Sequence, residues 1–291
     1  MKKIHQGLLI LAGLALFTSV LCAQQREAEP VEFIKISERL YEVKGGRGAR
    51  GGVYIGDDGV LVIDSKMDEN TVNSVREEIR QLTDKPILYL VNTHSDGDHT
   101  RGNRFFPESV IFISHENCRK EFFLPQRDGS PSEWSNPDLA PFIPSITFSD
   151  KMDIYMGSKK VELRHFGVGH TIGDIVLYFP EEQAAFIGDQ YVSGRPQLIH
   201  SYKGGSSFGH VKNLEKMLET LNARTFYSGH SDPVNREEIR NHIAQMRNRQ
   251  DRIKTALENG NSLDEIKRQC EEDELALAES IFNEIKSSST P

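Results

Sequence analysis

The sequence predicts an α/β protein, an αββα sandwich in which two mixed β-sheets pack face to face with helices on the outside. Short runs of β-branched and aromatic residues, such as Leu40–Val43, are separated by turns rich in Gly and Asp, which is typical of strands joined by hairpins. Between Asn70 and Leu82 apolar residues recur every three or four positions, which predicts an amphipathic helix. Because both halves of the 291-residue chain mix strands with helices, we expect one compact domain over residues 33–291.

The residues before this domain have the pattern of an export signal. A basic start, an apolar stretch over residues 8–21 and a small residue at Ala23 predict a secretory signal peptide over residues 1–23. Residues 24–32 are polar and are predicted to be the flexible N-terminus of the mature protein. A weak lipoprotein-like box at Cys22 makes lipidation the less favoured alternative. We therefore expect a periplasmic or secreted protein with no stable membrane span after cleavage.

Strand and helix patterns alternate along the rest of the first half. The helix over Asn70–Leu82 should cover one sheet face through Val72, Val75 and Ile79. The other expected elements are strands at Gly52–Ile55, Val60–Ile63, Ile87–Val91 and Val110–Ile113, and a helix near His115–Phe122. This β-α-β-α order is what a layered sandwich requires.

Four potential metal ligands follow the strand Ile87–Val91 within six residues: His94, Asp96, Asp98 and His99. Crowded carboxylates repel each other, so such a cluster is costly without a cation. Positions 94, 96 and 98 would share one face of an extended segment, and a turn would bring His99 back toward them. The alternative is a polar surface turn that happens to be rich in His and Asp.

Three later strand-like runs each end in a ligand-type residue beside a glycine. Val161–Phe166 leads to His170, Ala184–Ile187 leads to Asp189, and Thr225–Tyr227 leads to His230. If these strand ends converge on one cleft, they supply enough ligands for two metal ions. Asp174 is a candidate for orienting a ligand imidazole, or alternatively for capping the turn before the next strand.

Two long connections and a helical C-terminal region complete the chain. Residues 124–144 have no periodicity, and their Trp134 either closes over an apolar substrate or pins the loop to the body. Residues 190–209 hold Arg195, His200, Tyr202 and Lys203, which are weak candidates for substrate contacts. Residues 235–286 form a helical extension, with a capping box at Ser262-Leu263-Asp264-Glu265, that serves as a structural cover or a dimer face.

The order of these ligand residues resembles the metallo-β-lactamase superfamily, whose members carry His-x-His-x-Asp-His followed by a His, an Asp and a His. The matching residues are His94, Asp98, His99, His170, Asp189 and His230. Flanking segments are also similar: Asp57–Asp64, Val91–His94, Gly169–Asp174 and Ser228–His230. The resemblance covers roughly residues 33–235, and a chance match to such an ordered signature is improbable.

The chain departs from this family at Asp96, where most relatives have the second His of the motif. An extra anionic ligand weakens the Lewis acidity of a site and shifts its preference from Zn²⁺ toward iron or manganese. The resemblance implies two divalent ions, with Zn²⁺ expected and Fe or Mn as alternatives. The first ion would bind His94, Asp96 and His170, the second Asp98, His99 and His230, and Asp189 would bridge them. A damaged site that holds one metal is the other interpretation of Asp96.

The resemblance implies an exported metal-dependent hydrolase that uses a metal-bound hydroxide on an ester, thioester, lactone or lactam bond. Asp98 would orient the nucleophile or accept its proton. Two alternatives stay open: an iron-dependent oxidoreductase of the same fold, and a non-catalytic metal-binding relative. The formal net charge of -8 argues against a nucleic-acid partner, so we expect a small-molecule substrate; the oligomeric state stays undetermined.

Overall fold

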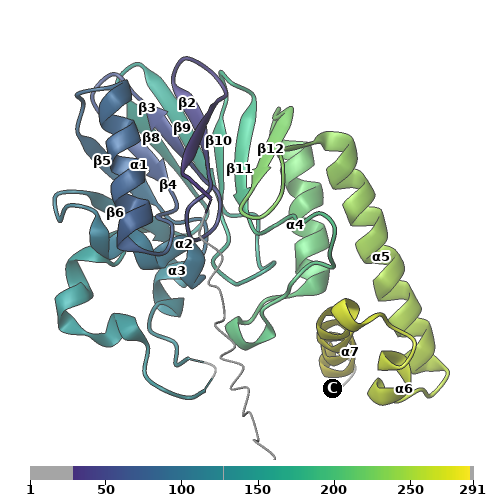
Figure 1. Cartoon of the computed structure of the whole chain (residues 1–291). Coiled ribbons are helices and arrows are strands. Elements are labelled where there is room, and N and C mark those ends of the chain that lie inside the picture. Colours follow the sequence, from purple (N-terminus) through teal and green to yellow (C-terminus); the bar gives the residue numbers. More distant parts are fainter. Residues whose placement is uncertain (1–28, 127, 289–291) are drawn as a thin grey trace, which may run out of the picture.

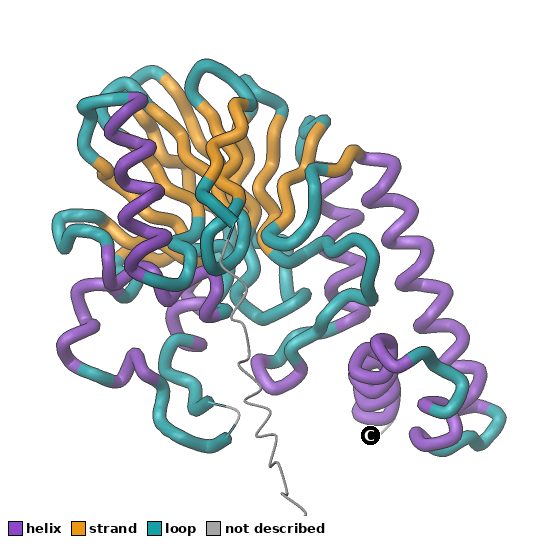
Figure 2. The backbone as a smooth tube through the Cα atoms, viewed as in Figure 1, coloured by secondary structure: helices purple, strands orange, loops and turns teal. Residues whose placement is uncertain are grey.

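Two β-sheets pack face to face in the computed structural model, which describes residues 29–126 and 128–288 (Figures 1 and 2). The first sheet runs in the order β1 (Glu32–Lys35), β2 (Leu40–Lys44), β3 (Gly51–Ile55), β4 (Val60–Ile63), β5 (Ile87–Val91), β6 (Ile111–His115) and β7 (Ile146–Phe148). The second runs in the order β13 (Val234–Asn235), β12 (Thr225–Ser228), β11 (Ala184–Gly188), β10 (Val176–Phe179), β9 (Lys159–Arg164) and β8 (Lys151–Met156). Both sheets mix parallel and antiparallel pairs, as predicted.

Helices cover the outer faces of the two sheets (Figure 1). Helix α1 (Glu69–Leu82) lies against the first sheet, and α4 (Ser207–Thr220) and α5 (Arg236–Glu258) lie on the side of the second. The shorter helices are α2 (Gly97–Thr100), α3 (Glu116–Glu121) and α6 (Leu263–Lys267), and α7 (Leu275–Ser288) closes the chain. This arrangement confirms the predicted sandwich.

Strand β4 shows how the sequence builds these layers. Its side chains alternate between two apolar cores, with Val60 and Val62 packed in the core under α1 and Leu61 and Ile63 in the core between the sheets. A strand that is buried on both faces needs an uninterrupted apolar run, which explains the sequence Val-Leu-Val-Ile. A third core lies between the second sheet and α4, α5 and α7.

The predicted elements of the first half and the C-terminal region are present with small shifts at their ends. Helices α5 and α6 of the C-terminal region begin with capping boxes, at Asn235 and at the predicted Ser262. Strand β8 and helix α4 were not assigned from the sequence, and α4 shortens the predicted 190–209 connection. Trp134 is 6% exposed and packs against the ring of Phe122, so it pins its loop to the body.

The predicted signal peptide over residues 1–23 lies outside the described residues, as do residues 24–28 of the predicted flexible segment. Strand β1 begins at Glu32, one residue before the predicted start of the domain. Within the described ranges, none of the helices combines the length and apolar character needed to span a bilayer.

Candidate metal centre

The motif His94–His99 lies at the carboxyl end of β5, where the chain turns into the single-turn helix α2. Asp96 has an extended backbone and occupies the N-cap position, and the N–H of His99 donates to its carbonyl. Asp98 and His99 are therefore on a helical turn. The expectation that positions 94, 96 and 98 share one extended face was wrong, because the helix starts directly after Asp96.

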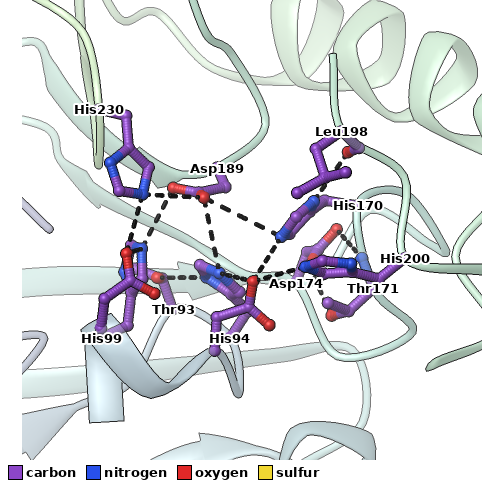
Figure 3. A network of polar contacts seen from close by, with 12 residues as sticks. Thr93, His94, His99, His170, Thr171, Asp174, Asp189, Leu198, His200 and His230 are labelled. Atoms are coloured by element: carbon purple, nitrogen blue, oxygen red, sulfur yellow. Dashed lines mark hydrogen bonds and ion pairs between the residues drawn. The ribbon is translucent and has the colours of Figure 1, made fainter. Parts of the chain in front are cut away.

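The other predicted ligands come from the second sheet and reach the same end of the sandwich (Figure 3). His170 lies in the turn between β9 and β10, Asp189 follows β11, and His230 follows β12. The seven side chains form two groups whose ligand atoms lie within 4.8 Å of one another: His94, Asp96, His170 and Asp189; and Asp98, His99 and His230.

Glycines allow this convergence because the backbone itself passes close to the ligands. Gly188 has a φ of 52°, and a Cβ there would lie 2.7 Å from Thr93 Oγ1. A Cβ at Gly229 would lie 2.4 Å from Asp189 Oδ1. The pairing of a glycine with a ligand residue in the sequence therefore has a steric cause at both positions.

Asp189 lies between the two groups. Its Oδ1 is 3.2 Å from His99 Nε2 and its Oδ2 is 3.2 Å from His230 Nε2. The same Oδ2 is 3.9 Å from His94 Nε2 and 4.0 Å from His170 Nε2. This position is compatible with the predicted bridging role, because Asp189 belongs to the first group but makes its shortest contacts with His99 and His230 of the second.

Several inward-facing polar atoms of the cluster lack partners. His94 Nε2, His99 Nε2 and Asp189 Oδ1 are buried, and within the described residues they take part in no hydrogen bond. Leaving such atoms unsatisfied costs free energy, and cations bound within the two groups would satisfy all three. The donor set of imidazoles and carboxylates also suits divalent transition metals, so these residues fit a metal centre.

A family model described as the metallo-beta-lactamase superfamily matches residues 50–230. The matched region covers more than half of the chain and contains all seven clustered residues. The chain belongs to the metallo-β-lactamase superfamily. Members of this superfamily are typically hydrolytic metalloenzymes that use divalent metals, which places this chain among metal-binding hydrolases at that coarse level.

Individual relatives are distant. The chain is 24% identical over 223 residues to metallo-beta-lactamase type 2 from Elizabethkingia meningoseptica, covering 69% of this chain and 83% of the relative. It is also 24% identical over 144 residues to subunit alpha of 2,4-dinitroanisole O-demethylase from Nocardioides sp. (strain JS1661), covering 48% of this chain and 40% of the relative. The solved metallo-beta-lactamase from Pontibacter korlensis has a TM-score of 0.62 at 15% identity, covering 75% of this chain and 99% of that one. This structural similarity establishes the fold.

The buried carboxylate of Asp64 orients His99. The sequence analysis did not identify Asp64 as part of the site. Asp64 Oδ2 accepts a hydrogen bond from His99 Nδ1 at 2.8 Å, and both Asp64 oxygens accept from Thr93. The contact directs His99 Nε2 toward the cluster. The sequence could have indicated this residue, because Asp64 directly follows the fully apolar strand β4.

Of the two roles that the sequence left open for Asp174, its contacts match the capping of a turn. Its carboxylate accepts hydrogen bonds from the N–H and the hydroxyl of Thr171, so it caps the turn that carries His170. The ring of His170 instead donates from Nδ1 to the carbonyl of Leu198 at 2.8 Å. Asp174 is too engaged with the turn to orient an imidazole directly, and capping the turn is the alternative that the sequence left open.

Asp96, the departure from the superfamily motif, is surrounded by positive and polar groups. Lys203 Nζ lies 2.5 Å from Asp96 Oδ1, and His200 Nε2 lies 2.8 Å from Oδ2. Both were candidates for substrate contact, but the structure turns both inward to Asp96. Burial opposes ionisation of Asp96, but its contacts with His170 and His200 outweigh burial and hold its pKa well below the ordinary value.

The carboxylates raise the proton affinity of the imidazoles beside them. Burial lowers the pKa of His170, but the hydrogen bond and charge of Asp96 outweigh it and raise the pKa to about 9. Hydrogen bonds to Asp189 and Asp98 raise the pKa of His230 to about 9. Burial also opposes ionisation of Asp98, but its contact with His230 lowers its pKa to about 2. The cluster therefore attracts positive charge.

Proposed function

We propose that this protein is a metal-dependent hydrolase with a binuclear site, loaded with Zn²⁺ and acting on a small-molecule ester, thioester, lactone or lactam. The observation that carries the proposal is the gathering of seven imidazole and carboxylate side chains from both sheets, in which the buried Nε2 atoms of His94 and His99 face carboxylates but form no hydrogen bond among the described residues. When bound, two divalent cations supply Lewis acidity and lower the pKa of a coordinated water.

Asp98 is the residue of the cluster best placed to handle a proton. Its side chain is 32% exposed, and Oδ2 lies 3.0 Å from His230 Nε2, whose side chain is 28% exposed. The other members are nearly inaccessible, so substrate reaches the cluster on the side of this pair. Because its pKa is low, Asp98 is ionised at neutral pH and can accept a hydrogen bond from an attacking water.

A small recess beside the motif supports a small substrate. It has a volume of about 200 Å³, and its lining includes Ser95, Gly97 and Lys203 next to the cluster and Trp134 and Tyr202 farther out. None of the seven clustered residues lines it, and it adjoins the cluster through Lys203, the ion-pair partner of Asp96; its volume favours a compact acyl group or ring. Two larger recesses, of about 460 and 710 Å³, lie against α5, and their linings include neither the seven clustered residues nor Ser95 and Lys203 beside them.

The environment of Asp96 favours hydrolysis over the iron-dependent alternative. The argument for iron rested on the additional negative charge of a third carboxylate in the site. Lys203 forms an ion pair with that carboxylate and compensates its charge. The balance of charge then resembles that of a site with histidine at this position, which suits Zn²⁺.

We also propose that the protein acts outside the cytoplasm, on the basis of the signal-like pattern over residues 1–23. Fractionation of cells that express the full chain, with sequencing of the N-terminus of the mature protein, tests this separately from catalysis. Cleavage after Ala23 is the expected result. An intact N-terminus in the cytoplasmic fraction would contradict export.

Activity is tested with the metal-loaded protein on a panel of p-nitrophenyl acetate, an acyl-homoserine lactone, an acyl thioester, nitrocefin and bis-p-nitrophenyl phosphate. We expect turnover of at least one carboxylic substrate that a chelator abolishes and Zn²⁺ restores. His170→Ala and Asp98→Asn should each reduce kcat by about 100-fold or more. A positioned acid–base group contributes at least this much to the rate. Full activity in both variants would refute the assignment, and oxygen consumption with bound iron would favour the oxidoreductase.

A further inference from the structure

Three imidazoles, where the sequence motif accounts for two, surround one oxygen of Asp96. Asp96 Oδ2 lies 2.8 Å from His200 Nε2, 3.1 Å from His170 Nε2 and 3.6 Å from His94 Nε2. His200 is thus the nearest of the three. It is 5% exposed, and its ring centre is 4.5 Å from that of His170.

We propose that His200 is a metal ligand and replaces the imidazole that the motif lost when Asp96 took its position. This inference rests on the proposed binuclear site. Two atoms that each lie about 2.0–2.1 Å from one tetrahedral ion are about 3.3 Å from each other. The three distances around Asp96 Oδ2 bracket this value, so His94, His170 and His200 each lie at about the distance from that oxygen that two ligands of one cation keep.

The position of Asp189 supports the same division of ligands. Its oxygens lie 3.2 Å from the Nε2 atoms of both His99 and His230, but 3.9 Å or more from those of His94 and His170. Figure 3 shows His170 between Asp189 and His200. With His200 in the first site, Asp189 is available to the second, and each ion has four protein ligands.

Lys203, on the same short segment as His200, holds Asp96 in the orientation that this site needs. Its Nζ contacts Oδ1 of Asp96 at 2.5 Å and also donates to Ser95 Oγ at 2.8 Å. Oδ1 is thereby occupied and Oδ2 faces the imidazoles. The two sites then differ in charge, because Asp98 and Asp189 fully balance a divalent ion while Asp96 shares its charge with Lys203. We therefore expect the site with Asp98 and Asp189 to bind its ion in the first step of a titration. The site with Asp96 and His200 should bind its ion in the second step.

Titration of the metal-stripped full-length protein with Co²⁺ tests this division. The visible d–d bands report coordination, and equilibrium dialysis with elemental analysis reports stoichiometry. Wild-type protein should bind two equivalents in two steps. His200→Ala and His200→Gln should both weaken the second step by more than about 100-fold, beyond the effect of losing a residue that only orients a ligand. Arg195→Gln, an exposed change in the same loop, should alter neither step.

The results separate the failure of this inference from the failure of the proposed function. If wild type binds two ions and His200→Gln, which keeps a hydrogen-bond donor, restores both steps to within tenfold, then His200 only positions Asp96 and the inference is overturned. If His200→Ala does not fold, the visible bands of Co²⁺ in His200→Gln decide instead: second-step bands identical to those of wild type would overturn the inference. Wild-type protein that binds no Co²⁺ would contradict the binuclear hydrolase itself.

Discussion

A single buried carboxylate, Asp64, determines how His99 faces the metal centre. In Asp64→Asn one of the two carboxylate oxygens becomes an NH₂ group, which is a hydrogen-bond donor. The N–H of the His99 ring needs an acceptor at this position. We expect Asp64→Asn to lower the affinity of the second site by 10- to 100-fold, the usual effect of losing such a partner. Competition with a coloured chelator measures this change.

A matched control for Asp64→Asn is Asp84→Asn, an exposed carboxylate in the loop after α1. It makes the same change in net charge far from the cluster and should leave affinity within twofold. Equal loss in the two variants would mean that overall charge, and not the contact with His99, sets the affinity. Unchanged affinity in both would remove Asp64 from the metal centre.

The raised pKa values of His170 and His230 predict a strong dependence of metal binding on pH. Both are about 9, so in the metal-free protein both imidazoles are protonated at pH 7.5 and must lose a proton to bind an ion. The apparent association constant should therefore rise with pH by about tenfold per unit for each displaced proton, and level off above pH 9. Calorimetric titrations in buffers of different ionisation enthalpy count the protons released.

The raised pKa values of His170 and His230 also predict that the metal-free protein becomes less stable as the pH rises. Their pKa values are raised from 6.5 in the folded state, so their contribution is complete below pH 6.5 and is lost as the pH rises through 9. Urea unfolding of the chelator-treated protein at pH 6 and pH 9 should show this decrease. A rise in stability over that range, or no proton release on binding, would contradict the assigned partners.

At this scale the sequence identified the ligands that follow strands, but for the loop residues His200 and Lys203 it predicted substrate contacts and not contacts with Asp96. His94, His170, Asp189 and His230 could be proposed because each follows an apolar run, and strand ends in a sandwich meet at one edge. His200 and Lys203 belong to a connection without periodicity, more than 100 residues from Asp96 in sequence. No local pattern indicates which side chains of such a loop turn inward.

Among the elements, α7 supports the loop that carries these two residues. Glu284 of α7 accepts hydrogen bonds from Ser206 Oγ and from the N–H of Ser207, both at 2.6 Å, at the start of α4. Ser280 of the same helix contacts Ser201. Helix α7 is thus a structural cover that also fixes the segment from Ser201 to Ser207, and the predicted dimer face is not needed to explain its apolar residues.

Replacement of Glu284 should destabilise the protein through the start of α4. We expect Glu284→Ala to reduce the free energy of unfolding by about 1–2 kcal/mol, because it removes a charged cap from a helix N-terminus. Denaturant unfolding measures the loss. Glu279→Ala on the same helix removes only a surface ion pair with Lys267 and should cost less than about 1 kcal/mol. A smaller loss at Glu284 than at Glu279 would contradict the bracing role.

Element types were more predictable than the local geometry of the motif. Helix α1 and strand β4 follow directly from apolar periodicity. The single turn of α2 was missed, because four residues are too short for periodicity and its glycine at position 97 suggests a turn. Helix α4 carries His210 and Asn213 on its buried face, and these polar residues obscure its apolar stripe.

In the whole molecule the metal centre joins the two sheets. His94, Asp98 and His99 follow a strand of the first sheet, whereas His170, Asp189 and His230 follow strands of the second. Without a cation, the sandwich must hold three carboxylates and two buried imidazole nitrogens without hydrogen bonds, those of His94 and His99, at the edge where its halves meet. Ions that bind only the folded arrangement should therefore stabilise the sandwich as a unit.

This linkage predicts a large effect of metal on thermal unfolding. Free Zn²⁺ at 100 times the Kd of a site adds about 2.7 kcal/mol for that site, because the unfolded chain does not assemble its ligands. Calorimetry should show a single transition whose Tm rises on addition of Zn²⁺ and falls with chelator. In Asp189→Asn, which removes the carboxylate between the groups, the rise should be at most half that of wild type. If the Tm of wild type does not change on addition of metal, or if two separate transitions appear, the cluster does not couple the two sheets.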